Sequence, residues 1–298
     1  MLRWRLISAT CLIALLVTIC WFDVNFPFSM RGIWLLPLCL FIGMAAVGEM
    51  LDLLRKQPSP PDTVSTYFGT MVIILSACVG CFRPDLVESS PEVLRILPLW
   101  AVAFGVLLAF AVQMQRYEKP GGVVAPVALG ALIMVYVGVM MSFIILLRIE
   151  FGNVRGMAAL LSLVVVVKLS DIGAYTFGRL LGRHKLVPKL SPGKTVEGAI
   201  GGLVAGCFGA WLMFNWLGPT MVDSTPGTPW WGWLLFGVVL TVAGVVGDLA
   251  ESLLKRDADR KDSSTWLPGL GGILDFMDSL LSAAPFAYLF WSCDIVTL

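Results

Sequence analysis

Long apolar segments separated by short polar stretches run through the chain from one end to the other. A helix needs about 20 mainly apolar residues to cross the hydrocarbon core of a bilayer, and nine segments meet or approach this length. They lie near residues 6–22, 34–54, 68–82, 97–112, 123–147, 157–177, 199–217, 233–254 and 273–292. The third, fourth and seventh are short, which leaves a tilted or partly re-entrant course open for them. We therefore predict an all-α, polytopic integral membrane protein with about nine transmembrane helices.

The composition agrees with this class and excludes several others. Hydrophobic residues make up 58% of the chain and charged residues only 14%, against about 25% charged residues in a soluble domain. The net charge of +1 gives no basic field for nucleic acid. His184 is the single histidine, which leaves little room for histidine-based metal sites or triads. The seven cysteines lie in or beside apolar segments, so we interpret them as small buried residues.

The loops differ in their content of Lys and Arg. The first apolar segment follows Arg3 and Arg5 but has no small-residue cleavage site after it, so we interpret it as an uncleaved first helix. Loops on the N-terminal side then carry most of the Lys and Arg residues. The positive-inside rule places this side in the cytoplasm and the C-terminus on the far side. The two most basic loops, 179–198 and 255–272, would both face the cytoplasm.

A polar stripe begins where the eighth predicted helix approaches the cytoplasmic surface. Its residues have i, i+3, i+4 and i+7 spacing, which places them on one helix face: Asp248, Glu251, Ser252 and Lys255. The ninth helix follows two glycines and carries a similar set: Asp275, Asp278, Ser279 and Ser282. One helix reaches this surface where the next leaves it, so we expect the carboxylates to meet at one depth.

Clustered carboxylates at a membrane boundary repel one another unless a cation lies among them. Hard oxygen ligands of this kind suit magnesium, which keeps waters and bridges to substrate phosphates. Candidate phosphate contacts come from the two basic loops: Lys185, Lys189, Lys194, Lys255, Arg256, Arg260 and Lys261. The glycines before the ninth helix could present N–H groups to phosphate. A phosphoryl or nucleotidyl transfer site requires these parts.

Structural interpretations compete with these functional ones. Juxtamembrane Lys and Arg residues outside the two loops are typical topology signals or lipid contacts: Arg55, Lys56, Arg116 and Lys119. Lys168 and Asp171 could pair with each other or line the polar site. Glu197 also fits a turn followed by a helix cap, and we interpret His184 as a loop residue. For Asp275 and Asp278 the alternative is a solvated helix start.

The polar positions fall into three ordered motifs. The last motif reads G-D-x-x-E-S-x-apolar-K-R, then K-D, then P-G-x-G-G-apolar-x-D-x-apolar-D. Its positions are occupied by Gly247, Asp248, Glu251, Ser252, Lys255, Arg256, Lys261, Asp262, Pro268, Gly269, Gly271, Gly272, Asp275 and Asp278. Upstream lie two further motifs. The first, D-x-x-A-Y-x-x-G-R, is formed by Asp171, Ala174, Tyr175, Gly178 and Arg179. The second, S-P-x-K-T-x-E-G, is formed by Ser191, Pro192, Lys194, Thr195, Glu197 and Gly198. In these motifs the chain resembles the phosphatidate cytidylyltransferases, also called CDP-diacylglycerol synthases.

The resemblance covers about residues 165–292, whereas the first 150 residues match only as hydrophobic segments. We accordingly divide the chain into N-terminal transmembrane helices, 1–150, and a catalytic transmembrane part, 151–298. Three positions depart from the family signature: Leu270 replaces a histidine, Phe276 an arginine and Gly193 a lysine.

The resemblance implies a magnesium-dependent transfer of CMP from CTP to phosphatidate, giving CDP-diacylglycerol and pyrophosphate. It places the enzyme in the bacterial inner membrane with its site facing the cytoplasm and membrane lipid around it. Asp248, Asp275 and Asp278 would hold the metal, with Lys255 as a further catalytic residue. Substrate and phosphate contacts would come from Lys194, Ser191, Arg256, Lys261, Arg179, Gly271, Gly272, Ser252, Glu251 and Asp171. A homodimer is kept as an assembly hypothesis, and no nucleic-acid partner is expected.

The loss of the signature histidine need not prevent this reaction. The second pKa of a phosphomonoester is about 6, so the attacking lipid phosphate is largely ionised at neutral pH without a base. The departures still leave alternatives open. These are a CTP-dependent lipid kinase, a cytidylyltransferase for another lipid phosphate, and a non-catalytic membrane protein that binds lipid or nucleotide.

Overall fold

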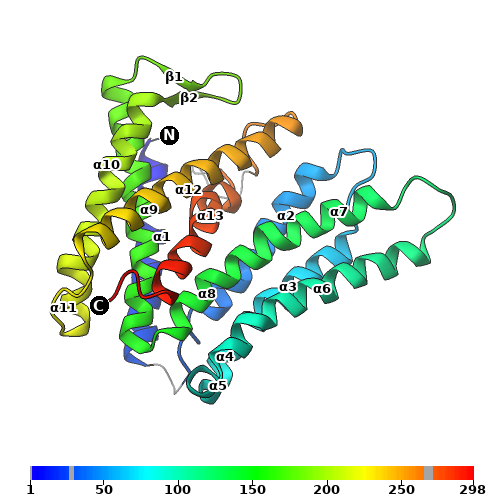
Figure 1. The fold of residues 1–298 in the computed structure, drawn as a ribbon. Helices are drawn as coiled ribbons and strands as arrows, with labels where there is room; N and C mark the ends of the chain where they lie inside the picture. Colours follow the sequence, from blue (N-terminus) through cyan, green and yellow to red (C-terminus); the bar gives the residue numbers. More distant parts are fainter. Residues whose placement is uncertain (1, 27–29, 265–270) are drawn as a thin grey trace. The chain divides into compact units, whose positions relative to one another are not determined.

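The computed structural model describes residues 2–26, 30–264 and 271–298, with side chains from residue 14 onward. It contains two compact units, which are described separately below. The first comprises Met1–Glu150 and Asp257–Phe276, and the second comprises Phe151–Arg256 and Met277–Leu298. Both are built almost entirely of helices, as the apolar segments predict (Figure 1).

The first unit contains eight α-helices and one π-helical turn within the described part of the chain. They are α1 (Leu2–Asn25), α2 (Leu36–Leu54), α3 (Thr63–Ala77), α4 (Val79–Phe82), α5 (Pro84–Ser89), α6 (Pro91–Gln115), α7 (Val124–Ile133), η1 (Met134–Val139) and α8 (Met140–Glu150). The core lies where Ile73, Ala101 and Met134 meet. The unit also contains a buried ion pair, in which Arg148 Nε of α8 lies 2.6 Å from Asp23 Oδ2 of α1.

The second unit contains the long helices that carry the polar motifs. Its elements are α9 (Asn153–Leu181), β1 (Lys185–Val187), β2 (Ser191–Thr195), α10 (Val196–Leu212), η2 (Met213–Leu217), α11 (Gly218–Val222), α12 (Trp230–Asp257) and α13 (Ile273–Ser292). The last residue of α12, Asp257, and the first turn of α13, residues 273–276, belong to the first unit. Helices α9 and α10 approach closely through small residues four apart in sequence, the arrangement that favours tight helix packing in membranes. At Gly202, for example, a Cβ atom would lie 3.1 Å from the Ser170 carbonyl oxygen.

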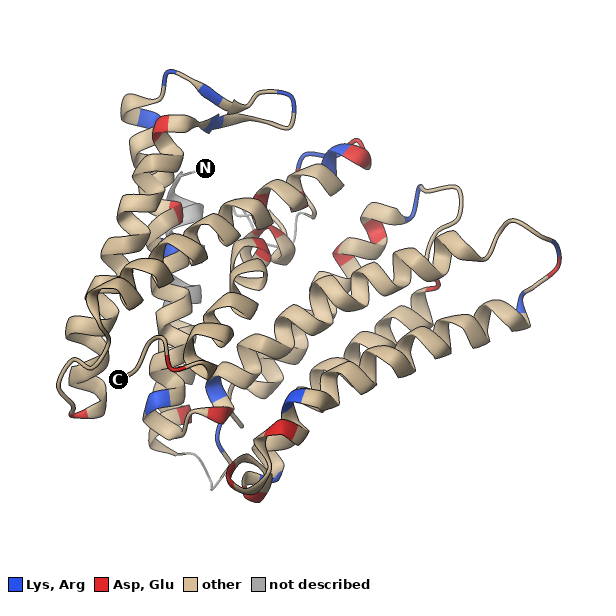
Figure 2. Ribbon diagram, in the orientation of Figure 1, with Lys and Arg blue, Asp and Glu red and all other residues tan. Residues whose placement is uncertain are grey.

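Within the described residues, seven helical segments are long and apolar enough to cross a membrane. They are Leu36–Leu54, Pro91–Gln115, Val124–Glu150, Asn153–Leu181, Val196–Val222, Trp230–Asp257 and Ile273–Ser292. Two shorter apolar helices, Ala14–Asn25 and Thr63–Ala77, coincide with the remaining predicted segments. The all-α, polytopic membrane fold is confirmed, while the count of nine stays a prediction. Lys, Arg, Asp and Glu residues lie mainly toward helix ends and in connecting loops (Figure 2).

Two of the three segments that seemed short are longer than the sequence pattern indicated. Helix α6 has 25 residues and continues past Pro98, and the helix that begins at Val196 continues through a π-helical turn to Val222. Only the third segment is short, because α3 ends at Ala77 and α4 begins beyond Cys78.

The basic loop at 179–198 contains structure that the sequence analysis did not predict. Helix α9 continues to Leu181, and an antiparallel β-hairpin follows, in which Lys185 pairs with Thr195 and Val187 with Ser191 (Figure 1). The turn is closed by the Leu190 N–H, which donates to the Val187 carbonyl oxygen over 3.2 Å. In the second basic loop, Pro268, Gly269 and Leu270 lie outside the described residues.

Candidate active site

Three carboxylates of the second unit form an acidic cluster. Asp248 and Glu251 lie one turn apart on α12, and Asp278 lies on α13. One oxygen from each lies within 4.8 Å of the others. We call these three residues the acidic cluster. The sequence predicted that all three carboxylates would meet here, with Asp248 and Asp278 as metal ligands and Glu251 as a substrate contact.

The close packing of α12 against α13 explains why these side chains meet. Gly247 lies directly before Asp248, and a Cβ atom there would lie 2.7 Å from the Asp278 carbonyl oxygen and overlap Ser282. Real side chains do not tolerate such a distance, so only glycine allows the two backbones to approach this closely. The glycine of the G-D motif therefore has a packing role beside the carboxylate.

Two of the three residues in the acidic cluster are buried. Glu251 is fully buried and Asp278 is 5% exposed. Asp278 Oδ1 accepts hydrogen bonds from Ser279, over 2.5 Å from the N–H and 3.1 Å from the hydroxyl. Buried carboxylates require paired charges or hydrogen bonds, because their desolvation is costly.

Lysines supply these paired charges. Lys194 Nζ lies 2.8 Å from Asp248 Oδ2, and Lys255 Nζ lies 2.5 Å from Glu251 Oε2. Lys194 lies on β2, so the hairpin brings a cation to the acidic cluster from outside the helices. Both lysines were predicted as phosphate contacts, and both adjoin the cluster.

A third carboxylate–lysine pair lies on α9. Lys168 Nζ is 3.3 Å from Asp171 Oδ2, which is the structural pairing left open by the sequence. Asp171 also lies within electrostatic reach of Asp248 and Lys194, and Lys168 within reach of Asp278. The pair therefore extends the polar site to α9, so the two interpretations of Lys168 and Asp171 are compatible.

The donor set of the acidic cluster fits a divalent cation. Three carboxylate oxygens within 4.8 Å are ligands of the hard type that magnesium accepts, with waters completing its shell. Lys194 and Lys255 balance only part of the charge of the three carboxylates, so a cation would relieve the remaining repulsion.

Asp275, the third predicted metal ligand, takes part in a network of the first unit. Its Oδ2 atom accepts hydrogen bonds from the Gly272 N–H over 2.8 Å, and from the Ser263 N–H over 3.1 Å and hydroxyl over 2.8 Å. An acidic residue at the third helical position that bonds the N-cap N–H is half of a capping box. Asp275 thus stabilises the start of α13, and its metal role stays a prediction.

The glycine pair before α13 shapes the same helix start. Gly271 has φ +92°, a conformation that favours glycine, and a Cβ atom there would lie 2.7 Å from Asp275 Oδ2. A Cβ atom at Gly272 would overlap Ser263 and Glu49. The Gly272 N–H, predicted as a phosphate donor, donates to Asp275 in this structure. Phosphate contacts by Gly271 and Gly272 stay predictions.

The other predicted substrate residues occupy varied surroundings. The Ser252 hydroxyl lies 3.5 Å from Asp248 Oδ1, at the edge of the acidic cluster. Arg256 Nε donates to the Leu190 carbonyl oxygen over 3.3 Å and so links α12 to the hairpin. Exposed Arg179 donates to the Tyr175 hydroxyl over 3.0 Å. Ser191 is half-buried at the start of β2, and Lys261 is exposed in the first unit.

The helix cap suggested by the S-P-x-K-T-x-E-G motif is formed by Thr195. Its hydroxyl accepts a hydrogen bond from the Gly198 N–H over 3.1 Å, which caps α10. The Glu197 carboxylate accepts the Arg183 N–H over 3.0 Å and lies 2.6 Å from His184 Nδ1. Glu197 therefore ties the start of the hairpin to α10, and His184 is a loop residue paired with a carboxylate.

Glu49 on α2 was not predicted as a site residue from the sequence. This carboxylate is 5% exposed and accepts hydrogen bonds from the backbone N–H groups of Ile273 and Leu274. An ionisable residue inside an apolar helix is a signal for a polar network, and Glu49 lies inside the second predicted segment. Its partners lie more than 200 residues away along the chain, so no local pattern identifies them.

Comparisons with known proteins extend the motif evidence over nearly the whole chain. The sequence model of the "Cytidylyltransferase family" matches residues 3–294. A protein of Haemophilus influenzae named phosphatidate cytidylyltransferase is 30% identical, with 98% of this chain and 99% of the relative covered. Relatives of the same name from Staphylococcus saprophyticus and Staphylococcus aureus are 32% and 31% identical, each over 93% of this chain and 95% of the relative.

The match includes the first 150 residues, which the sequence analysis could align only as hydrophobic segments. The acidic cluster with its lysines and the length of these matches lead to the same conclusion. The chain belongs to the cytidylyltransferase family.

Proposed function

We propose that this protein transfers CMP from CTP to phosphatidate, giving CDP-diacylglycerol and pyrophosphate. The observation that carries the proposal is the acidic cluster of Asp248, Glu251 and Asp278 with Lys194 and Lys255 beside it. It lies in a chain whose relatives, matched over nearly their full lengths, are named phosphatidate cytidylyltransferase. A charged site of this kind supplies the metal ligands and cations that nucleotidyl transfer needs.

We assign the metal to Asp248 and Asp278, with Glu251 as the third carboxylate of the cluster. Asp275, one turn before Asp278 on α13, is kept as a further candidate ligand. When bound, magnesium supplies charge neutralisation of the triphosphate and of the leaving pyrophosphate.

The lysines have two alternating partners in this proposal. Lys194 pairs with Asp248 and Lys255 with Glu251, and these carboxylates are the proposed metal ligands. On substrate binding, each ammonium group would donate to a phosphate oxygen instead. The resting ion pairs thus keep both sets of charged groups in place until the triphosphate arrives. Arg256 and Arg179, which lie near the hairpin and on α9, are further candidate phosphate contacts.

The transfer itself needs no protein nucleophile. An oxygen of the lipid phosphate attacks the α-phosphorus of CTP, and the bond to the bridging oxygen of pyrophosphate breaks as the new bond forms. The attacking phosphate has a second pKa of about 6 and is largely dianionic at neutral pH. The site can therefore operate with Leu270 in place of the signature histidine.

We place the reaction at the cytoplasmic face of the bacterial inner membrane, following the distribution of Lys and Arg among the loops. CTP would arrive from the cytoplasm, and phosphatidate from the adjoining leaflet. Homodimer formation stays a prediction.

The test uses purified protein, phosphatidate vesicles, magnesium and CTP labelled at either the α- or the γ-phosphate. We expect α-label in the lipid product and release of pyrophosphate. Transfer of the γ-label would identify a lipid kinase instead. Absence of any labelled lipid, with a preparation that unfolds cooperatively, would contradict the proposal. Asp278→Asn should lower the rate at least a hundredfold, whereas Asp85→Asn, an exposed aspartate on α5, should not change it.

A further inference from the structure

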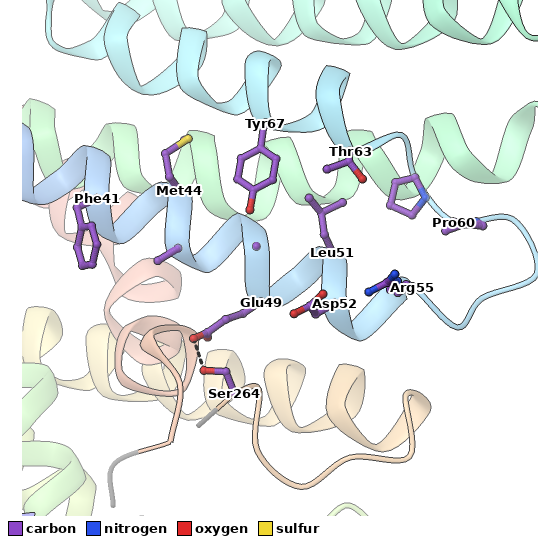
Figure 3. A pocket seen from close by; sticks show the side chains of 13 residues that line it. Phe41, Met44, Glu49, Leu51, Asp52, Arg55, Pro60, Thr63, Tyr67 and Ser264 are labelled. Atoms are coloured by element: carbon purple, nitrogen blue, oxygen red, sulfur yellow. Dashed lines mark hydrogen bonds between the residues drawn. The ribbon is translucent and has the colours of Figure 1, made fainter. Parts of the chain in front are cut away.

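The Glu49 carboxylate joins two distant parts of the first unit. It lies on α2, and its oxygens contact hydrogen-bond donors of residues 263, 264, 273 and 274. Figure 3 shows the contact with Ser264. Oε1 accepts from the Ser264 hydroxyl over 2.6 Å and from the Ile273 N–H over 2.9 Å. Oε2 accepts from the Leu274 N–H over 2.8 Å and lies 2.8 Å from the Ser263 hydroxyl oxygen.

These partners include the first two N–H groups of α13. The first N–H groups of any helix lack intrahelical acceptors and must be satisfied by other groups. A carboxylate is well suited to this position, because it is attracted by the positive end of the helix dipole and forms charge-assisted hydrogen bonds. Helix α13 is thus capped by a residue of α2, in addition to its local cap by Asp275.

Ser263 connects the two caps. Its hydroxyl oxygen lies 2.8 Å from Glu49 Oε2 and 2.8 Å from Asp275 Oδ2. A side chain at Gly272 would overlap both Ser263 and Glu49, so these groups fill the space around the helix start. The position of Glu49 therefore fixes the residue at which α13 begins and the direction of the Asp275 carboxylate.

Asp278 lies on the same helix as Asp275. Asp275 and Asp278 are three residues apart on α13, which is nearly one helical turn. A change in where α13 begins, or in its rotation at Ile273, would move both carboxylates together. Polar groups that orient metal ligands from outside the coordination sphere typically change affinity or activity by about 10- to 100-fold when removed.

Asp52 is the control residue for Glu49, because both line the same cavity on α2. The cavity has a volume of about 740 Å³ and lies between α2 and α3, with Arg55 and Tyr67 also in its lining. In Figure 3 the Glu49 carboxylate is bonded to Ser264, while Asp52 lies one turn further along α2. Asp52 carries the same charge as Glu49 and lies on the same helix. It has no assigned role in the site.

We propose that Glu49 is a positioning residue for the reaction, which holds the start of α13 and thereby orients the aspartates that α13 carries. Its catalytic consequence rests on the proposed function, whereas the anchoring of α13 rests on the contacts of Glu49 alone. The two parts can be measured separately.

The experiment compares Glu49→Gln with Asp52→Asn in the full-length protein. Glutamine is close in size but replaces one acceptor oxygen by an NH₂ group, which cannot accept from the helix N–H groups. We expect backbone hydrogen exchange in a peptide containing Ile273 and Leu274 to become at least threefold faster in Glu49→Gln. We expect kcat to fall by about 10- to 100-fold, with the KM for CTP changed by less than about threefold. Asp52→Asn should match the wild type in all three measurements.

Each outcome bears on one part of the proposal. Unchanged exchange at the start of α13 in Glu49→Gln would overturn the anchoring. Faster exchange with kcat within about twofold of wild type would overturn the positioning role. If the wild-type protein itself transfers no CMP, the proposed function fails, and hydrogen exchange alone decides the anchoring.

A second variant covers the case in which Glu49→Gln does not fold. Ser264→Ala removes one donor to Oε1 and keeps the carboxylate. We expect exchange at Ile273 and kcat to change in the same directions as in Glu49→Gln, by smaller factors. Wild-type values for both in Ser264→Ala would contradict the proposal.

Discussion

At the scale of single residues, Lys194 has two roles. It neutralises Asp248 over 2.8 Å in the resting protein, and the proposed reaction requires it to bind the triphosphate. An isolated ammonium group held in a partly apolar site is costly, so an acidic partner keeps it charged and in place. The lysine and its carboxylate are therefore best understood as one functional pair.

This pairing predicts how substitutions at Lys194 act. Lys194→Gln should raise the KM for CTP by about tenfold or more, because one charge-assisted contact to phosphate is lost. Lys119→Gln, an exposed loop residue interpreted as a topology signal, should leave the KM unchanged. Steady-state kinetics with varied CTP at saturating phosphatidate measure both. An unchanged KM in Lys194→Gln would remove Lys194 from the substrate site.

At the scale of elements, packing between helices sets the geometry of the site. The acidic cluster needs α12 and α13 in close contact, and Gly247 provides this contact by having no side chain. The hairpin then adds Lys194 from β2, held near α12 through the Arg256–Leu190 hydrogen bond.

Gly247→Ala should therefore separate the two helices at Asp248 and Asp278. Overpacking of this kind costs about 1–3 kcal/mol of folding free energy, and the displaced carboxylates should also lower the rate of CMP transfer. Gly122→Ala is the matched control, since a Cβ atom there has no neighbour within 4 Å. Thermal unfolding in detergent and the transfer assay test both effects. Wild-type stability in Gly247→Ala would contradict the packing argument.

The start of α3 allows a prediction about pH. The Asp62 carboxylate accepts the Ser65 N–H over 2.7 Å and pairs with Arg116 Nη1 over 2.7 Å. Burial by itself would raise the pKa of Asp62, but these hydrogen bonds and the Arg116 charge lower the pKa below its ordinary value. A carboxyl group with a lowered pKa stabilises the fold above its unfolded-state pKa, and this contribution is lost as the pH falls through the lowered value.

Asp62→Asn should keep the helix cap but lose the charge, whereas Asp62→Ala should lose both and about 1 kcal/mol of cap energy. At pH 7 we expect wild type to be more stable than Asp62→Asn, and the two to converge as the pH drops below the lowered pKa. Thermal unfolding followed across this range measures the difference. A gap that widens on acidification would have the wrong sign for this explanation.

At the scale of the whole molecule, the sequence predicted what depends on local pattern. Apolar runs identified the helical membrane fold, and helical spacing brought Asp248, Glu251 and Asp278 together. The hairpin was missed because β1 and β2 are only three and five residues long and β2 contains Pro192 and Gly193. Glu49 and the double cap of α13 were missed because they depend on contacts between residues far apart in sequence, which no single-sequence pattern records.

The predicted orientation can be tested in spheroplasts. In a variant without the seven native cysteines, Gly193→Cys on the hairpin should resist a membrane-impermeant maleimide until the membrane is opened. Ser224→Cys, in the loop between α11 and α12, should react in intact spheroplasts. The reverse labelling pattern would place the acidic cluster on the opposite face of the membrane.

The buried Asp23–Arg148 pair has a consequence for biosynthesis. Asp23 lies in the last turn of the first helix, and its partner lies 125 residues later. A buried carboxylate without its cation is strongly destabilised, so α1 cannot occupy its final place before Arg148 has been made. At about 5–20 residues per second, the ribosome needs about 6–25 s to reach Arg148. During this interval α1 cannot take up its final packed position, although it is the first helix of the chain to be made.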